Sequence, residues 1–248
     1  MDLTVASIDR LAALGVRPDE RIVELEDGRL FGVDQEGNVS EIFERSVIAR
    51  YALEINTLSG FVNYIKSNIE RVEKPMLVHI KNETTVYLRG PLEIDGERET
   101  LAKAKAIVPD FDFGYFLDME SFNIALQSKF VPNDHRAILL QVIGNVSEDN
   151  IRQTGDDGVS QAVTINQGIA TKADVRVPNP VDLAPYRTFL EVEQPTSQFI
   201  FRMKDGPRGA IFEADGGAWR NQAIVNIREY LKEQLSEEID SGRITIIA

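Results

Sequence analysis

The sequence of 248 residues contains no cysteine. Disulfides, thiolate nucleophiles, iron–sulfur clusters and cysteine-based zinc sites are therefore excluded. The first residues, MDLTVASIDRLAALGV, lack the basic start and the long apolar run of a signal peptide. No stretch reaches the ~20 apolar residues that cross a bilayer. These absences predict a cytoplasmic protein with no membrane partner.

Residues and motifs typical of enzymes are also scarce. His79, in the apolar stretch MLVHI, and His135, in the polar stretch PNDHR, are the only histidines, too few for both a triad base and a metal cage. The Walker phosphate-binding pattern and the dinucleotide-binding GxGxxG are absent. Ser160 and Thr164 lack the GxSxG context of an activated nucleophile. The sequence therefore favours a non-enzymatic protein and predicts no cofactor.

The charge balance is acidic, with 40 acidic and 27 basic residues and a formal net charge of −13. A surface of this sign repels phosphate backbones, so direct nucleic-acid binding is disfavoured. Lys103 and Lys105, in LAKAKAIV, are basic locally, but on an alternating strand such lysines usually form a solvated face. Acidity commonly serves solubility. The alternative is a DNA mimic, whose clustered carboxylates occupy a basic cleft on another protein.

Three segments show the apolar spacing of amphipathic helices. They are residues 57–72, 118–130 and 218–235. Thr57 and Asp118 are candidate N-caps of the first two. Pro75 and Pro132 follow those two helices and prevent their continuation. Each helix is expected to lie on an apolar surface.

Most of the remaining sequence is typical of strands. MLVHI and TTVYLRG predict a hairpin across residues 76–90, and SQFIFRM and GAIFEA predict another around the turn KDGPRG. Further β-like runs are LAKAKAIV, RAILLQVIGNV, GVSQAVTINQG, YRTFLEVEQ and RITIIA. PNPVDLAPY is expected to be an extended loop or a sheet edge. The pattern predicts an α+β fold, with mainly antiparallel sheets and about three amphipathic helices packed on them.

The predicted organisation has two parts. Residues 1–45 contain a short helix and turn-separated segments at EDG and QEGN, which indicates an N-terminal arm or small subdomain. Residues 46–248 are expected to form the core domain.

The stretch TGDDGVSQ raises the question of a metal or phosphate site. Asp157 and Gly158 form a DG pair, which favours a turn because glycine accepts positive φ and aspartate can bond its own backbone. The alternating acidic positions of a calcium loop do not follow. A turn is the preferred interpretation.

Paired carboxylates are the best candidates for a metal site. Glu191 and Glu193 share one face if FLEVEQ is a strand, and Glu213 and Asp215 do so in IFEADGG. Were those strands neighbours, the four side chains could bind Mg²⁺, as in a metal-dependent nuclease or phosphatase. The alternative, which we favour, is a solvated sheet face.

Three apolar residues are candidates for an interface. Trp219 follows DGG at the start of the third helix, where it either anchors that helix in the core or serves as an interface hot spot. Ile244 and Ile246, in the C-terminal RITIIA, belong either to a last core strand or to a strand that pairs between subunits.

The blocks TLSGFVNYIKSN, DMESFNIALQSKF, DDGVSQAVTINQG, PYRTFLEVEQPTSQFIFR and FEADGGAW resemble the YfdQ-like family of phage and prophage proteins, a family of unknown function. The resemblance covers roughly residues 50–235 and does not include residues 1–45. It implies a protein of the bacterial cytoplasm, encoded by a phage or prophage, and it implies no known active site.

Three functions are consistent with these features. The first is a non-enzymatic accessory protein that self-associates into a homo-oligomer. The second is an inhibitor of a host defence or DNA-processing protein, acting as an acidic DNA mimic or by ligand sequestration. The third is a metal-dependent accessory factor in phage DNA metabolism.

Overall fold

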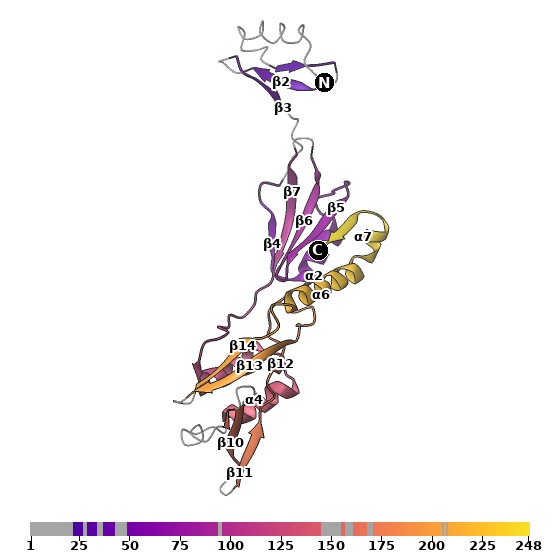
Figure 1. The fold of residues 1–248 in the computed structure, drawn as a ribbon. Helices are drawn as coiled ribbons and strands as arrows, with labels where there is room; N and C mark the ends of the chain where they lie inside the picture. Colours follow the sequence, from indigo (N-terminus) through magenta and orange to yellow (C-terminus); the bar gives the residue numbers. More distant parts are fainter. Residues whose placement is uncertain are drawn as a thin grey trace. The chain divides into compact units, whose positions relative to one another are not determined.

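The computed structural model of the chain describes residues 22–26, 29–33, 37–42, 49–93, 96–144, 155–156, 161–167, 171–204, 206 and 208–248. They form an α+β fold (Figure 1). Contacts within the chain divide it into two units, one of residues 1–50 with 92–99 and one of residues 51–91 with 100–248. The sequence had placed the first boundary at residue 45.

The first unit contains a three-stranded antiparallel sheet. Its strands are β1 (Ile22–Glu24), β2 (Leu30–Val33) and β3 (Val39–Ile42). Val23, Phe31 and Val33 are buried together on it. Gly37, in the predicted QEGN turn, has a φ of +87°, which favours glycine. The predicted N-terminal helix and the Asp27–Gly28 turn lie outside the described residues.

The second unit contains a five-stranded sheet in the order β15-β5-β6-β7-β4. Its strands are β4 (Leu53–Ile55), β5 (Met76–Asn82), β6 (Thr85–Leu92), β7 (Arg98–Lys105) and β15 (Ile244–Ile247). β5 and β6 form the predicted antiparallel hairpin. The outer strands are both parallel to their neighbours, β15 to β5 and β4 to β7. The C-terminal strand therefore completes a sheet begun by the early part of this unit.

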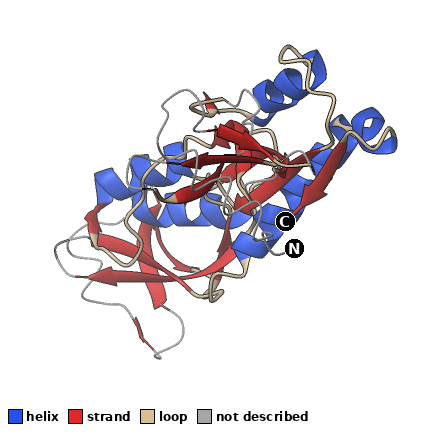
Figure 2. Cartoon of the chain, turned by 90° about the horizontal axis from the view of Figure 1, so that it is seen from above, coloured by secondary structure: helices blue, strands red, loops and turns tan. Residues whose placement is uncertain are grey.

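Helices cover one face of this sheet (Figures 1 and 2). They are α2 (Leu58–Ser67) and α6 (Trp219–Gln234), followed by the short α7 (Ser236–Asp240). The Thr57 hydroxyl caps α2 by accepting the Gly60 N–H at 3.1 Å, as the sequence predicted. The predicted end at residue 72 is wrong. Asn68 takes a left-handed conformation, with φ of 42°, and ends the helix after Ser67.

A four-stranded antiparallel sheet, in the order β12-β13-β14-β8, forms the other large core of this unit. Its strands are β8 (Leu117–Asp118), β12 (Val181–Leu183), β13 (Ser197–Lys204) and β14 (Arg208–Glu213). The predicted β13–β14 hairpin is confirmed, and β12 is an edge strand as PNPVDLAPY predicted. The predicted helix is α3 (Met119–Lys129), and the Asp118 carboxylate caps it by accepting the Ser121 N–H at 2.9 Å.

A second helix on this sheet corrects the prediction for RAILLQVIGNV. This segment was expected to be a strand, but its residues 136–144 belong to the helix α4 (Asp134–Gly144). Asn133 explains the difference, because its side-chain oxygen accepts the Arg136 N–H at 2.7 Å and so supplies the N-terminal cap. Apolar residues at three- and four-residue spacing, Leu139, Val142 and Ile143, are then buried on one side of the helix.

The remaining strands are β9 (Gly155–Asp156), β10 (Gln161–Gln167) and β11 (Thr171–Arg176), in an antiparallel sheet. Asp156 pairs with Gln161. The rest of the predicted Asp–Gly turn lies outside the described residues. In the part of the chain that the structure describes, no helix combines the length and the apolar character needed to span a membrane.

Candidate functional site

The segment YRTFLEVEQ, between β12 and β13, is not the strand that its composition predicted. The buried side chain of Gln194 makes the hydrogen bonds that a strand partner would have made. Its oxygen accepts the N–H groups of Arg187 and Thr188, at 2.9 and 3.2 Å. Its amide nitrogen donates to the carbonyls of Phe189 and Val192, also at 2.9 and 3.2 Å. One side chain therefore satisfies four backbone groups of a partly buried loop.

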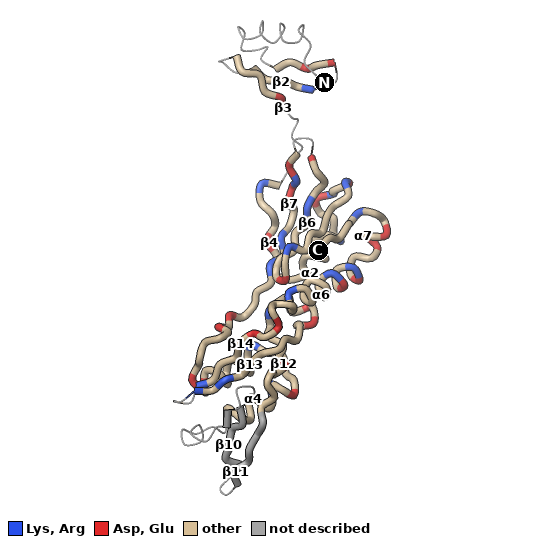
Figure 3. Tube along the Cα trace, in the orientation of Figure 1, with Lys and Arg blue, Asp and Glu red and all other residues tan. Residues whose placement is uncertain are grey.

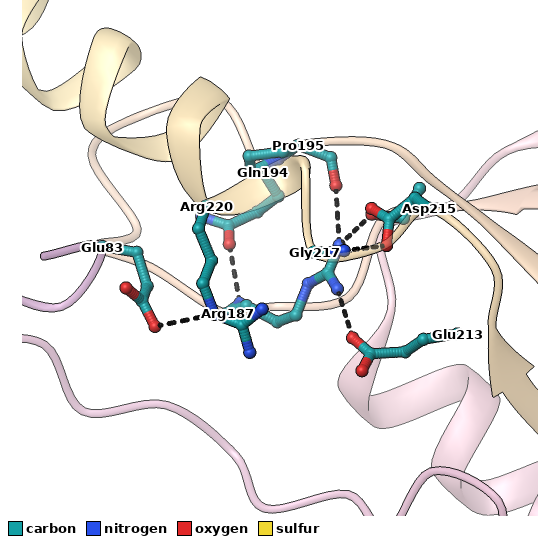
Figure 4. A network of polar contacts seen from close by, with 9 residues as sticks. Glu83, Arg187, Gln194, Pro195, Glu213, Asp215, Gly217 and Arg220 are labelled. Carbon is teal, nitrogen blue, oxygen red and sulfur yellow. Dashed lines mark hydrogen bonds and ion pairs between the residues drawn. The ribbon is translucent and has the colours of Figure 1, made fainter.

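This loop places Arg187 at the centre of a cluster of polar contacts (Figure 4). The Arg187 side chain is 8% exposed and forms an ion pair with Glu213, Nη1 to Oε1, at 3.2 Å. Its Nη2 donates to the hydroxyl of Ser197 and to the carbonyl of Pro195. We call Arg187, Gln194, Ser197, Glu213, Asp215 and Trp219 the arginine network.

Trp219 supplies the apolar wall of the arginine network. The Arg187 guanidinium carbon lies 3.9 Å from the centre of the Trp219 ring, close enough for a cation–π contact. Trp219 is the first residue of α6 and is 7% exposed. Trp219 is thus buried within the chain, in contact with Arg187, and its role at an interface stays a prediction.

Burial and hydrogen bonding in the network shift the pKa of two groups. Burial lowers the pKa of Arg187 to about 10, against the opposing effect of Glu213 and Asp215, so the guanidinium stays protonated at neutral pH. Burial acts to raise the pKa of Asp215, but hydrogen bonds from Ser197 and from the N–H groups of Gly217 and Trp219 lower it overall. Asp215 is thus held as a carboxylate beside a cation.

A second set of contacts connects the loop to the β5–β6 hairpin. The Thr188 hydroxyl donates to the carbonyl of Glu83 at 2.5 Å. The Glu83 carboxylate lies 3.6 Å from Nε of Arg220, whose guanidinium is 4.7 Å from the Trp219 ring. Phe189 and Val192, in the same loop, are buried in the core of the five-stranded sheet. The loop therefore joins the two large sheets of the unit through both polar and apolar contacts.

The structure brings only two of the four predicted metal-binding carboxylates to one cluster. Glu213 and Asp215 both act on Arg187. Glu191 instead accepts hydrogen bonds from the N–H and hydroxyl of Ser59, both at 3.2 Å, in the first turn of α2. The side chain of Glu193 is exposed. Within the described ranges, no three acidic or histidine side chains are placed to hold a metal ion.

Neither histidine lies in the arginine network. Nδ1 of His135 accepts the Asp182 N–H at 2.8 Å and so connects α4 to β12. His79 is on β5, beside the ring of Tyr87. The interface candidates on β15 have their side chains on the core, where Ile244 is 2% exposed and Ile246 is partly buried. An interface at β15 would therefore use its backbone.

Sequence reasoning missed Arg187 and Gln194. A single arginine in YRTFLEVEQ carries no pattern that distinguishes a buried position from an exposed one, and the alternation of the segment predicted a strand. Pro195 gave no signal either, because a proline favours extended backbone at the residue before it and is compatible with a strand that ends at Gln194.

The arginine network connects the loop to β13, β14 and α6. Its cation contacts a carboxylate, a hydroxyl, a carbonyl and a ring, and its carboxylates contact that cation and N–H groups, whereas Nε of Arg187 and Nε1 of Trp219 are buried without a hydrogen-bond partner among the described residues. Comparison with protein-family models, curated proteins and solved structures finds no match for this chain. The resemblance to the YfdQ-like family stays a prediction.

Proposed function

We propose that this protein is a non-enzymatic phage or prophage accessory protein that self-associates into a homo-oligomer in the bacterial cytoplasm. One observation carries the self-association. β15 is an outer strand of the five-stranded sheet, and among the described residues only β5 pairs with it. An outer strand offers a row of backbone donors and acceptors to another strand.

The direction of the backbone groups identifies which residues would pair. The Met76 N–H donates to the Arg243 carbonyl at 2.8 Å, so the backbone of Arg243 faces β5. In a parallel ladder the N–H and C=O of one residue point to the same side, and successive residues alternate. The N–H and C=O groups of Ile244 and Ile246 therefore point to the open edge, while their side chains pack on the core.

The proposal that the protein is non-enzymatic is supported by the arginine network, whose charged groups contact one another and hold loops together. The phage setting rests on the resemblance of residues 50–235 to the YfdQ-like family. Both are consistent with a protein whose role is to bind rather than to catalyse.

The test is the native mass of the purified protein, measured by light scattering on a sizing column at low and high micromolar concentration. We expect a discrete oligomer. Ile246→Pro removes one outward-pointing N–H, which an edge strand tolerates, and should lower the native mass. Ile246→Ala is the matched control, because it loses more of the side chain but keeps the N–H, and should preserve the oligomer.

A wild-type protein that is monomeric at high micromolar concentration would overturn self-association. An Ile246→Pro oligomer of unchanged mass would exclude β15 as the contact. A monomer would shift the weight to the inhibitor hypothesis, which a search for a stoichiometric, salt-sensitive partner in host lysate would then test.

A further inference from the structure

The five-stranded sheet has a second face, opposite its helices, with a composition unlike that of the chain as a whole. Val78 pairs with Leu88 and Ile80 with Val86, and all four are buried against the helices. Because side chains alternate along a strand, the pairs between them point the other way. Those pairs are His79 with Tyr87 and Leu77 with Arg89.

The same alternation on β7 adds two lysines. Ala102 and Ala104 are fully buried on the helix side, so Lys103 and Lys105 lie on the opposite face. Lys81 extends the series on β5 and is exposed. We call this surface the open face, and it comprises Leu77, His79, Lys81, Tyr87, Arg89, Lys103 and Lys105.

The open face is basic in a chain whose net charge is −13. It carries four lysine and arginine side chains, Lys81, Arg89, Lys103 and Lys105. One carboxylate, Glu54 on β4, lies 3.2 Å from Lys103 and offsets part of that charge. Figure 3 shows basic residues on the neighbouring strands β6 and β7. Burial is the largest cause that lowers the pKa of His79, and the positive charges of Arg89 and Lys81 lower it further. The second effect agrees with a positive potential at the His79 ring.

An aromatic ring stands among these cations. Tyr87 is half-buried on β6, with the Arg89 guanidinium 4.9 Å and the Lys81 ammonium 5.9 Å from its ring centre. The His79 ring is 6.3 Å away, centre to centre. Aromatic rings on a sheet, flanked by arginine and lysine, can stack an unpaired base while the cations contact the adjoining phosphates.

We propose that the open face binds single-stranded nucleic acid. An unpaired strand can present a base to Tyr87 and its phosphates to the surrounding cations at the same time, whereas a duplex keeps its bases stacked. An acidic peptide would satisfy the cations but would make no use of the ring. The total charge of −13 disfavours nucleic-acid binding, and the acidic surface outside the open face repels phosphates. Binding is therefore confined to the open face, and contacts between its cations and phosphates make the affinity fall as salt rises.

The test is fluorescence anisotropy with a labelled oligothymidine of about 20 nucleotides, at ~50 and ~200 mM salt. We expect measurable affinity at the lower concentration that falls with salt. The Lys81→Glu, Lys105→Glu double variant changes two exposed side chains and should weaken binding at least about tenfold. The Lys66→Glu, Lys232→Glu double variant makes the same charge change on α2 and α6, and should bind much as the wild type does.

The ring is tested separately. Tyr87→Leu should weaken binding about tenfold with little change in the salt dependence, and Tyr87→Phe, which keeps the ring, should restore most of it. Three results would each overturn the proposal: no binding at ~50 mM salt, equal losses in the two double variants, or polyglutamate binding as tightly as oligothymidine with Tyr87→Leu unchanged.

Discussion

Gln194 offers the sharpest test of how the loop between β12 and β13 is held. Its side chain is 7% exposed and makes four hydrogen bonds to the backbone of this loop. Gln194→Ala removes all four at once. At about 1 kcal/mol net for each bond, and with some of the orphaned backbone groups remaining away from water, we expect a loss of about 3–5 kcal/mol.

Urea unfolding followed by circular dichroism measures this loss. For a slope of about 2 kcal/mol per molar urea, the midpoint should fall by about 1.5–2.5 M. Gln194→Glu keeps the acceptors for the two N–H groups but cannot donate to the two carbonyls, so it should be destabilised as well. Gln198→Ala, at an exposed position of β13, is the control and should change stability by less than about 0.5 kcal/mol. A Gln194→Ala variant within about 1 kcal/mol of the wild type would show that these four bonds do not hold the loop.

Three further predictions concern single side chains. Glu191→Ala removes the acceptor for the Ser59 N–H in the first turn of α2 and should lower the unfolding free energy by about 0.5–1 kcal/mol, whereas the exposed Glu193→Ala should not, as paired thermal melts would show. The pKa of Asp215 is lowered in the folded state, so the Asp215 carboxylate stabilises the fold at pH values above the pKa it has in the unfolded chain. This contribution disappears as the pH falls through the pKa of the folded state. The difference in unfolding free energy between the wild type and Asp215→Asn should therefore be largest at neutral pH and shrink in acid. Gly209→Ala would place a methyl group 2.8 Å from a phenylalanine ring of α3 and should cost about 1–3 kcal/mol, whereas Gly144→Ala, with open space around it, should be neutral or stabilising in the same urea titration.

Local signals predicted much of this fold. The β5–β6 hairpin follows from alternating apolar residues around a polar turn, and α3 from an aspartate cap followed by apolar residues at helical spacing. The α4 segment was predicted wrongly as a strand, because a nearly continuous apolar run is typical of both buried strands and buried helices. The Asn133 cap favours the helix.

The candidate site was harder to predict, because its contacts join residues distant in sequence. Thr188 bonds to the carbonyl of Glu83, and Glu191 caps a helix that begins at Leu58. Composition can identify carboxylates, but whether four of them converge depends on which strands are neighbours. Here a loop replaced one of the expected strands, so Glu191 and Glu213 serve different elements.

The open edge of β15 and the open face belong to one sheet, so the two proposals have a common geometric consequence. If two β15 strands pair antiparallel about a two-fold axis perpendicular to the sheet, the ladder continues and both open faces lie on the same side. Ile247 on β15 pairs with His79 on β5, so the open face begins one strand away from the open edge of β15. A long single strand would then cross both faces, and the wild type should bind long oligothymidine more tightly and with a steeper salt dependence than Ile246→Pro. A short strand that fits one face should bind the two proteins equally. If the wild type and Ile246→Pro bind the long strand with equal affinity, as they bind the short one, the β15 strands do not pair in this way. That result would leave each of the two proposals standing separately.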